Sequence, residues 1–409
     1  MSEKIDSETD TAGDITIEPE RGARKQSIIP GVDIVKGLWS RQSKATRLVI
    51  RSVAIAAGIA LLVYLPFLNI LPFAQVRTDL SPEGSSWSAV LFQVVVYMIV
   101  AVGLNIVIGL AGLLDLGYIG FYAIGAYSVA LFGSPSSPVT EKIANTFNLS
   151  TGWAVPFTAC IPIAIAFALM FGVLLGAPTL RLRGDYLAIV TLGFGEIIRI
   201  VLRNLDITGG SAGIVEIPAP PGPEITNEYG SRVGLFNRLD HEYWYWLALV
   251  VLFLLILFAR RLEYSRVGRA WLAIREDEDA AGLMGVDALK FKLWAFAIGA
   301  ALGAMAGALF ASHQTAITPN DFQLNLSFLF VAMVVIGGSG NMVGALLGAF
   351  MITYLPERFR DLQEWRPFAF GLALVLVMIF RPQGMVPSRR RAAEFADRKH
   401  EAEEAATDV

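Results

Sequence analysis

Long uncharged apolar runs limit the folds open to this chain more than any other feature of its sequence. A helix needs about 20 apolar residues to cross the hydrocarbon layer of a membrane, and runs such as Trp153–Gly176 satisfy that length. Only 17% of the residues are charged, whereas soluble domains carry about 25%. The sequence therefore predicts an all-α integral membrane protein.

The apolar runs predict about ten membrane-spanning helices. The run Phe322–Pro356 is uncharged and too long for one crossing, so the stretch Gly337–Asn341 is expected to divide it into two helices. In chain order, the other expected spans are Ser52–Phe73, Ala89–Leu113, Leu116–Phe132, Trp153–Gly176, Tyr186–Leu202, Tyr243–Ala259, Leu293–Ser312 and Pro367–Phe380.

The basic residues indicate which segments face the cytoplasm. With the N-terminus inside the cell, most of the 33 Lys and Arg residues fall in cytoplasmic segments, as the positive-inside rule requires. Both termini are therefore expected in the cytoplasm. Residues 1–46 are polar and are predicted to be a disordered cytoplasmic extension. Residues 47–387 form the expected transmembrane domain, and residues 388–409 form a charged cytoplasmic tail.

The cytoplasmic segment 260–292 is densely charged but regularly patterned. Val267, Trp271 and Ile274 recur at helical spacing between charged residues, which predicts a short amphipathic helix at the inner face of the membrane. Such a helix is a natural docking surface for a soluble partner. On the outer side, the segment 205–242 is long and Pro-rich, so it is either a landing surface for a partner or a spacer.

Glu196 lies in the middle of the fifth predicted span, where a carboxylate is costly unless it pairs with a cation or faces a polar interior. Arg199 follows three residues later on the same helical face. A structural ion pair and a place on a substrate pathway are equally good interpretations of these two residues. Asp115, between the second and third spans, poses the same choice, with a structural role favoured.

A glycine-rich turn, Thr208–Gly213, follows the fifth span. The backbone groups of Gly209, Gly210 and Ser211 could bind a charged terminus of a substrate, as in the broken-helix sites of transporters. An ordinary loop is the alternative interpretation.

Gly299, Gly303 and Gly307 recur four residues apart in the seventh predicted span. Small residues at this spacing let helix backbones approach closely in a membrane, so these glycines are expected to pack helices together. The stretch around Ser339 matches the G-x-S-G pattern of intramembrane serine proteases, which also need a histidine beside the serine. The candidate, His313, is predicted at the outer end of its span and Ser339 at the inner end, which argues against a protease.

Several kinds of site are missing from the sequence. It has no G-x-x-x-x-G-K-[ST] phosphate-binding loop and no Gly-Lys dipeptide, so if ATP drives this protein, another polypeptide must bind the nucleotide. Cys160 is the only cysteine, which excludes an internal disulfide. The histidines show no metal-ligand spacing. We therefore expect no cofactor or metal in this chain, no enzymatic activity of its own and no nucleic-acid partner.

Four stretches of the sequence are characteristic when taken together: Gly109–Tyr127, Leu180–Arg199 with the turn behind it, Val267–Asp279 and Arg381–Gly384. They resemble the permease subunits of bacterial branched-chain amino acid ABC importers, specifically the longer of the two permeases in such systems. The resemblance covers roughly Val90–Pro387. It implies the ABC importer permease fold and a multi-pass protein of the bacterial plasma membrane.

The resemblance also implies a heteromeric importer. A second permease would pair with this chain, two ATPase subunits using ATP and Mg would bind at the cytoplasmic face, and an extracytoplasmic binding protein would deliver a branched-chain or related hydrophobic amino acid. Importers of urea and short amides share much of the pattern and give an alternative substrate class. An ion-coupled secondary transporter is the main rival class.

The same resemblance assigns coupling with the ATPase to the region Arg266–Gly285. The residues expected to take part are Arg266, Gly268, Arg269, Trp271, Ile274, Arg275, Glu276, Asp277 and Gly285.

Overall fold

The computed structural model describes residues 58, 62–67, 87–148, 150, 152–182, 184–226, 232–236, 241–358, 368, 371–372, 375–376, 379 and 384–386. The predicted extension 1–46, the tail 388–409 and most of the first and tenth predicted spans lie outside these residues. The chain forms two compact units, Met1–Leu65 and Pro66–Val409. In the first unit, the described residues are helical, and the short 3-10 helix η1 (Leu65–Phe67) begins at its last residue.

The second unit is a bundle of helices with one small hairpin. In the hairpin, β1 pairs with β2 in antiparallel register. In chain order the elements are α4 (Trp87–Leu104), η2 (Asn105–Leu110), α5 (Ile119–Gly133), α6 (Pro138–Phe147), α7 (Phe157–Thr179), α8 (Asp185–Asn204), η3 (Asp206–Thr208), η4 (Gly210–Ala212), β1 (Glu224–Thr226), β2 (Arg232–Gly234), α9 (His241–Glu263), α10 (Arg266–Glu276), α11 (Glu278–Leu283), α12 (Ala288–Gln314), η5 (Pro319–Phe322), α13 (Leu324–Gly337) and α14 (Met342–Arg358).

Four helices in the described part of the chain are long and apolar enough to cross a membrane: α4 continued by η2, α7, α9 and α12. Two further apolar helices, α13 and α14, are shorter. They are separated at the glycine-rich stretch that was predicted to divide this run, because Gly338 and Gly340 both take positive φ angles there. The described part of the chain is therefore predominantly helical, with helices suited to a membrane, which is consistent with the predicted fold class. The full set of crossings and the orientation of the termini stay predictions.

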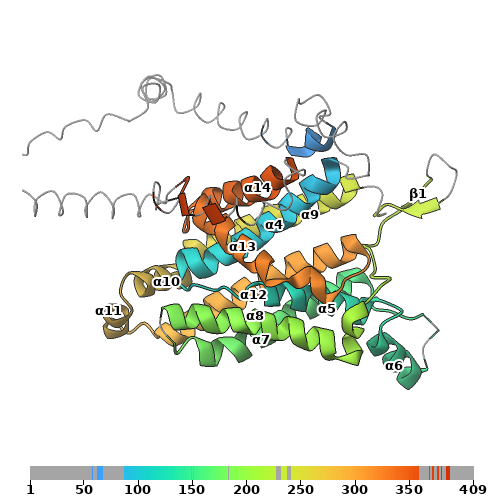
Figure 1. Ribbon diagram of the computed structural model, residues 1–409, viewed down its shortest axis with the longest axis horizontal. Coiled ribbons are helices and arrows are strands. Elements are labelled where there is room, and N and C mark those ends of the chain that lie inside the picture. The colour runs from blue at the N-terminus through green and yellow to red at the C-terminus, as the bar shows by residue number, and fades with distance from the viewer. Residues whose placement is uncertain are drawn as a thin grey trace, which may run out of the picture. The chain divides into compact units, whose positions relative to one another are not determined.

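The long helices run side by side. In Figure 1, α10 and α11 lie at one end of the helices, and α6 and β1 lie at the opposite end. We call these the α10 end and the α6 end of the bundle. Helix α12 occupies its centre, packed on α4, α5 and α7.

The three glycines of α12 lie where neighbouring chain segments come closest. A Cβ atom at Gly299 would clash with the Val107 side chain, and one at Gly303 would come within 3.0 Å of the Tyr118 ring. At Gly307, a Cβ atom would overlap the backbone carbonyl of Tyr122. Backbone contacts of this kind need residues without a side chain, as the four-residue spacing of small residues indicates.

The charged segment between α9 and α12 folds into two short helices rather than the single predicted one. Ser265 begins α10 because its side chain accepts a hydrogen bond from the Gly268 N–H (3.3 Å). Asp277 ends α10 and begins α11, and its carboxylate accepts from the N–H groups of Asp279 and Ala280 (2.9 Å each). Short polar side chains at these positions satisfy backbone donors that a helix start leaves free.

Candidate functional site

A break in the helical structure lies between α4 and α5. The predicted second and third spans reached Leu113 and resumed at Leu116, but the helix ends at Leu110 in the π-helical turn η2, and α5 begins only at Ile119. The segment 111–118 between them is irregular. Asp115, which was placed at the inner end of the two spans, is instead only 1% exposed inside the bundle.

Contacts with three other helices hold this segment well inside the bundle. The Leu116 N–H donates to Thr191 Oγ1 of α8 (3.0 Å), and Ser327 Oγ of α13 donates to the Leu116 carbonyl. The Tyr118 hydroxyl donates to the Gly299 carbonyl, about halfway along α12 (2.7 Å). Irregular backbone at membrane depth is tolerated where it is buried in protein or lines a cavity, and these contacts satisfy the first condition.

The carboxylate of Asp115 is only partly satisfied. Its Oδ1 accepts a hydrogen bond from the Gly117 N–H (2.9 Å). Thr191 lies near the carboxylate, but its hydroxyl donates to the Ala188 carbonyl (3.0 Å). Among the described residues, Oδ2 has no hydrogen-bond partner. Asp115 therefore has one free acceptor in the least regular part of the bundle, a property that the charge pattern of the sequence could not reveal.

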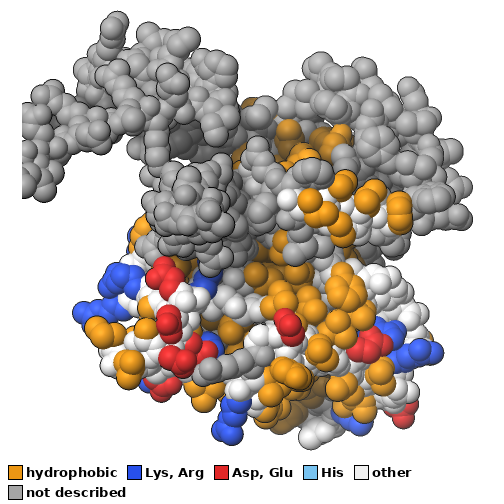
Figure 2. All heavy atoms as spheres, turned by 60° about the vertical axis from the view of Figure 1, so that its left-hand side comes forward, with side chains coloured by type: hydrophobic (Ala, Val, Ile, Leu, Met, Phe, Trp, Pro, Cys, Tyr) orange, Lys and Arg blue, Asp and Glu red, His pale blue; other side chains and the backbone are white. Residues whose placement is uncertain are grey.

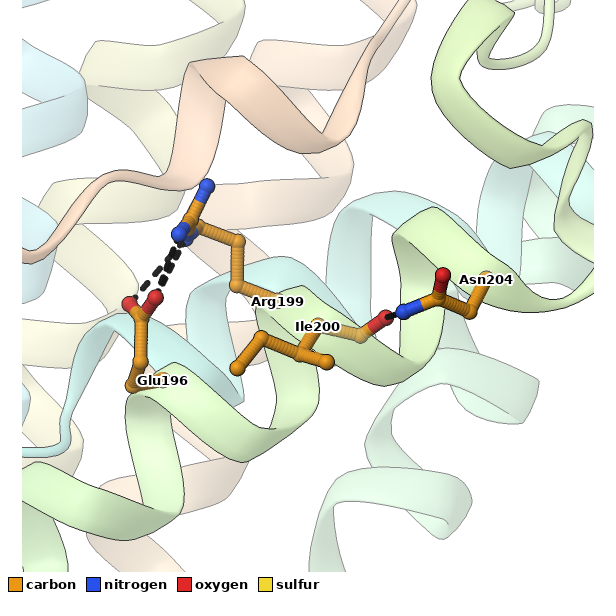
Figure 3. Close-up of polar contacts among 4 residues, drawn as sticks. All are labelled: Glu196, Arg199, Ile200 and Asn204. Atoms are coloured by element: carbon orange, nitrogen blue, oxygen red, sulfur yellow. Dashed lines mark hydrogen bonds and ion pairs between the residues drawn. The ribbon is translucent and has the colours of Figure 1, made fainter.

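Glu196 and Arg199 form the ion pair that their spacing predicted (Figure 3). Arg199 Nε donates to both carboxylate oxygens of Glu196 (3.1 and 3.0 Å), and its Nη2 also contacts Oε1. The side chains are 32% and 21% exposed for Glu196 and Arg199, respectively. Nearby on the same helix, Gly193 has open space where a side chain would stand. The pair therefore lies on a partly open face of α8.

The glycine-rich turn after α8 uses several backbone donors internally. Gly209 donates to the Asp206 carbonyl (3.1 Å), and Gly210 donates to the Leu205 carbonyl (3.1 Å). Both glycines have positive φ angles, which glycine adopts without steric cost. The turn, including exposed Ser211, lies at the α6 end of α8 and is thus separated along that helix from Asp115 and Glu196.

The apolar face of α10 packs against its own bundle. Trp271 is fully buried, and its Nε1 donates to the Phe291 carbonyl at the start of α12 (2.7 Å). Ile274 is buried on the same face, and Gly268 allows close approach to the carbonyls of Leu262 and Glu263. The expected contact of Trp271 and Ile274 with an ATPase stays a prediction, whereas their packing within this chain is observed. Both side chains attach α10 to the bundle.

A different pair of apolar side chains projects from this end of the molecule. Leu283 is 90% exposed and Met284 is 85% exposed, directly before Gly285, whose φ is positive. We call Leu283 and Met284 the exposed tip. Sequence reasoning missed it because the two residues have no helical repeat; their only signal is their place beside a glycine in a charged segment.

Exposed charged residues precede and follow the exposed tip along the chain, among them Asp279 and Asp287. Figure 2, which brings the α10 end forward, shows acidic and basic groups beside hydrophobic ones. Glu278 of α11 pairs with the buried Lys292 of α12 (2.6 Å), which attaches α11 to the bundle. The predicted coupling residues that are exposed here are Arg266, Arg269, Glu276, Asp277 and Gly285. Arg275 points inward and donates to the carbonyl of Gly109.

Ser339 and His313 lie near opposite ends of α4. The His313 ring stacks on Phe92, near the start of α4, with ring centroids 4.1 Å apart. The residue after Ser339, Gly340, donates to Asn105 Oδ1 at the far end (2.8 Å). A rise of about 1.5 Å per residue puts these two points roughly 20 Å apart. The predicted separation is confirmed, and a serine–histidine pair is excluded. The described residues also contain no cluster of three or more potential metal ligands.

Comparison with known proteins identifies a family whose model matches most of this chain. The model of a family described as a branched-chain amino acid transport system permease component matches residues 86–381. The high-affinity branched-chain amino acid transport system permease protein LivM of Escherichia coli is 42% identical over 72% of this chain and 68% of its own length.

More distant relatives carry related names. The probable branched-chain amino acid transport permease protein LivM of Methanocaldococcus jannaschii is 28% identical over 74% of this chain and 93% of its own length. The corresponding permease protein LivH of Escherichia coli is 25% identical over 71% of this chain and 91% of its own length. No solved structure matches this chain.

Proposed function

This chain belongs to the permease components of branched-chain amino acid transport systems, and from that membership we propose that it is the longer transmembrane permease of an ATP-driven importer. It moves leucine, isoleucine, valine or related hydrophobic amino acids into the cell by alternating access. A second permease, two ATPase subunits on the cytoplasmic side and an extracytoplasmic binding protein complete the complex.

The exposed tip is the observation that best supports an ATPase partner at this end of the bundle. Two large apolar side chains stand almost fully in the open among charged groups, and a surface of this composition fits a partner's apolar pocket with a polar rim. The chain has no phosphate-binding loop of its own. A partner that supplies ATP hydrolysis at this end accounts for both facts.

The face of α8 that carries Glu196 and Arg199 is our candidate for part of the substrate pathway. Much of the exposed surface of the long helices is apolar and suited to lipid, as at Leu174 of α7, and the exposed surface of α8 is also apolar at Ile197. The Glu196–Arg199 pair interrupts this apolar surface. Ionised side chains in a membrane normally face protein or a water-filled path. Because both Escherichia coli permeases resemble this chain, the second permease is expected to be a homologue that packs across a pseudo-twofold axis. We place the α8 face at that axis, because its ion pair would be costly against lipid.

Reconstitution tests the proposed function directly. Proteoliposomes containing both permeases, the ATPase subunits and the binding protein should take up radiolabelled leucine only when ATP is present. Unlabelled isoleucine or valine should compete, and urea or acetamide should not. ATP-independent uptake by this chain alone, driven by an ion gradient, would replace the importer with a secondary transporter. Competition by urea would select the alternative substrate class.

Changing Glu196 and Arg199 separates a pathway role from a structural one. Replacing both with leucine removes the pair without leaving an unpaired charge, so folding and assembly should be nearly unaffected. If the pair faces the substrate, we expect uptake of the zwitterionic amino acid to fall by about ten-fold, the effect of losing one charged hydrogen bond. The measurement is initial uptake rate against leucine concentration.

Single replacements supply the control for this pair. Arg199→Leu leaves an unpaired carboxylate and should lower both the yield of assembled complex and uptake. If the double variant transports at the wild-type rate, Glu196 and Arg199 have only a structural role.

A further inference from the structure

The Arg275 side chain points away from the charged surface of α10 and into the bundle. It lies in the last turn of α10, and its Nη1 donates to the carbonyl of Gly109 in η2. Its neighbour Glu276 stays exposed, and so does Arg269, earlier on the same helix. Arg275 is therefore the described basic residue of α10 that contacts the end of α4 and η2.

The acceptor is a carbonyl that needs an external donor. The last carbonyls of a helix have no partner within the helix, and cations are favourable beside them because of the helix dipole. In η2, the carbonyls of Ile106 and Val107 accept from Ala111 and Leu113 (3.1 and 3.0 Å). The Gly109 carbonyl lies next to the point where the chain leaves the helix, and Arg275 caps it.

Glycines make room for the Arg275 side chain at this junction. A Cβ atom at Gly112 would come within 2.8 Å of Arg275 Cγ, and one at Gly340 would lie 3.1 Å from Nη1. Both glycines also have positive φ angles. The Gly340 N–H donates to Asn105 Oδ1, which adds the turn between α13 and α14 to the same cluster. Arg275 thus contacts the π-helical turn, the break and the α13–α14 turn together.

The segment held by this cluster is the irregular stretch 111–118 that carries Asp115. Its regular backbone bonds to η2 end at Leu113. Beyond that point it is held by the side chain of Asp115 within the segment and by Thr191 and Ser327 of other helices. Single π-helical turns occur frequently at functional sites. Arg275 therefore donates its hydrogen bond directly before the irregular segment begins.

We propose that Arg275 is a positioning residue that links α10 to the break between α4 and α5, so that movement of α10 is transmitted to the segment 111–118. This inference rests on the proposed function for the source of the movement, which is the ATPase bound at the exposed tip. Arg275 is then not a docking residue. It acts one step later, inside the permease.

Two variants test the link. Arg275→Ala removes the cap, whereas Lys142→Ala removes an exposed basic side chain of α6, at the opposite end of the bundle from the proposed ATPase contact. In the reconstituted complex, we expect Arg275→Ala to retain its ATPase subunits and ATP hydrolysis while uptake per ATP falls about ten-fold. Arg275→Lys should restore part of the coupling, because an ammonium can still donate to the carbonyl but lacks the planar fork of arginine.

A second readout does not depend on transport. Hydrogen–deuterium exchange of residues 111–118 should be about ten-fold faster in the Arg275→Ala complex and unchanged in Lys142→Ala. Unchanged exchange, equal losses in both variants, or release of the ATPase by Arg275→Ala would each overturn the inference. Absence of ATP-driven uptake by the wild-type complex would instead defeat the proposed function, and the exchange rates would still decide whether Arg275 holds the break.

Discussion

Replacing Leu283 and Met284 together with aspartate is expected to release the ATPase subunits and abolish ATP-driven uptake. Each side chain contributes about 1.5–3 kcal/mol when it is fully buried by a partner. Losing both contributions weakens the complex by at least about 100-fold, since 1.4 kcal/mol is a factor of ten in affinity. The measurement is the amount of ATPase that co-purifies with the permease, followed by uptake in proteoliposomes.

The permease itself should fold normally in this double variant, because Leu283 and Met284 are 90% and 85% exposed and contribute little to its own packing. Phe147→Asp is the matched control, since Phe147 is 71% exposed at the α6 end of the bundle. That control should keep its ATPase. If the Leu283/Met284 variant also keeps its ATPase at wild-type stoichiometry, the exposed tip is not the docking contact.

Gly307→Ala is expected to reduce the yield of folded protein more than any other single methyl addition in α12. The new Cβ atom would overlap the Tyr122 carbonyl, so α5 and α12 must move apart. Adding a methyl group to a packed interior costs about 1–3 kcal/mol. Backbone atoms cannot rotate away as a flexible side chain can, which puts Gly307 at the upper end of that range. Thermal unfolding in detergent and the monodisperse yield measure the effect.

Gly193→Ala is the matched substitution for Gly307→Ala. A Cβ atom there would meet nothing within 4 Å, and alanine has a helix propensity about 1 kcal/mol better than glycine. This control should be neutral or slightly stabilising. Equal stability of the two variants would mean that α5 and α12 do not pack as closely as their backbones indicate.

The positions of the long helices were largely predictable. The fourth predicted span, Trp153–Gly176, corresponds to α7 (Phe157–Thr179), and the seventh, Leu293–Ser312, lies within α12 (Ala288–Gln314). Apolar runs are sufficient to locate these helices, because a single segment inside lipid can hydrogen-bond all of its backbone N–H and C=O groups only by forming a helix. The boundaries differ by a few residues, because capping groups such as Asp287 extend the helix into polar sequence.

The break before α5 was not predictable from the apolar pattern. The residues around Asp115 are mostly apolar and contain no proline. The pattern therefore predicted that they belong to the ends of two adjacent membrane-spanning helices. Their irregular path depends on hydrogen bonds to Thr191 and Ser327, which are far away in sequence. Contacts of this kind exist only after other helices have packed.

The charged segment shows most clearly what each level of structure determined. By itself, the sequence determined that the chain is a helical membrane protein with a charged, helical segment between two spans, because composition and helical periodicity are properties of local sequence. It could identify the apolar face of α10 but not what covers that face. Only the tertiary structure decided that Trp271 and Ile274 are covered by this chain's own bundle, that Arg275 points inward, and that Leu283 and Met284 stay exposed. The reason is physical: periodicity states which side chains share a face, whereas burial depends on which distant segments pack against it.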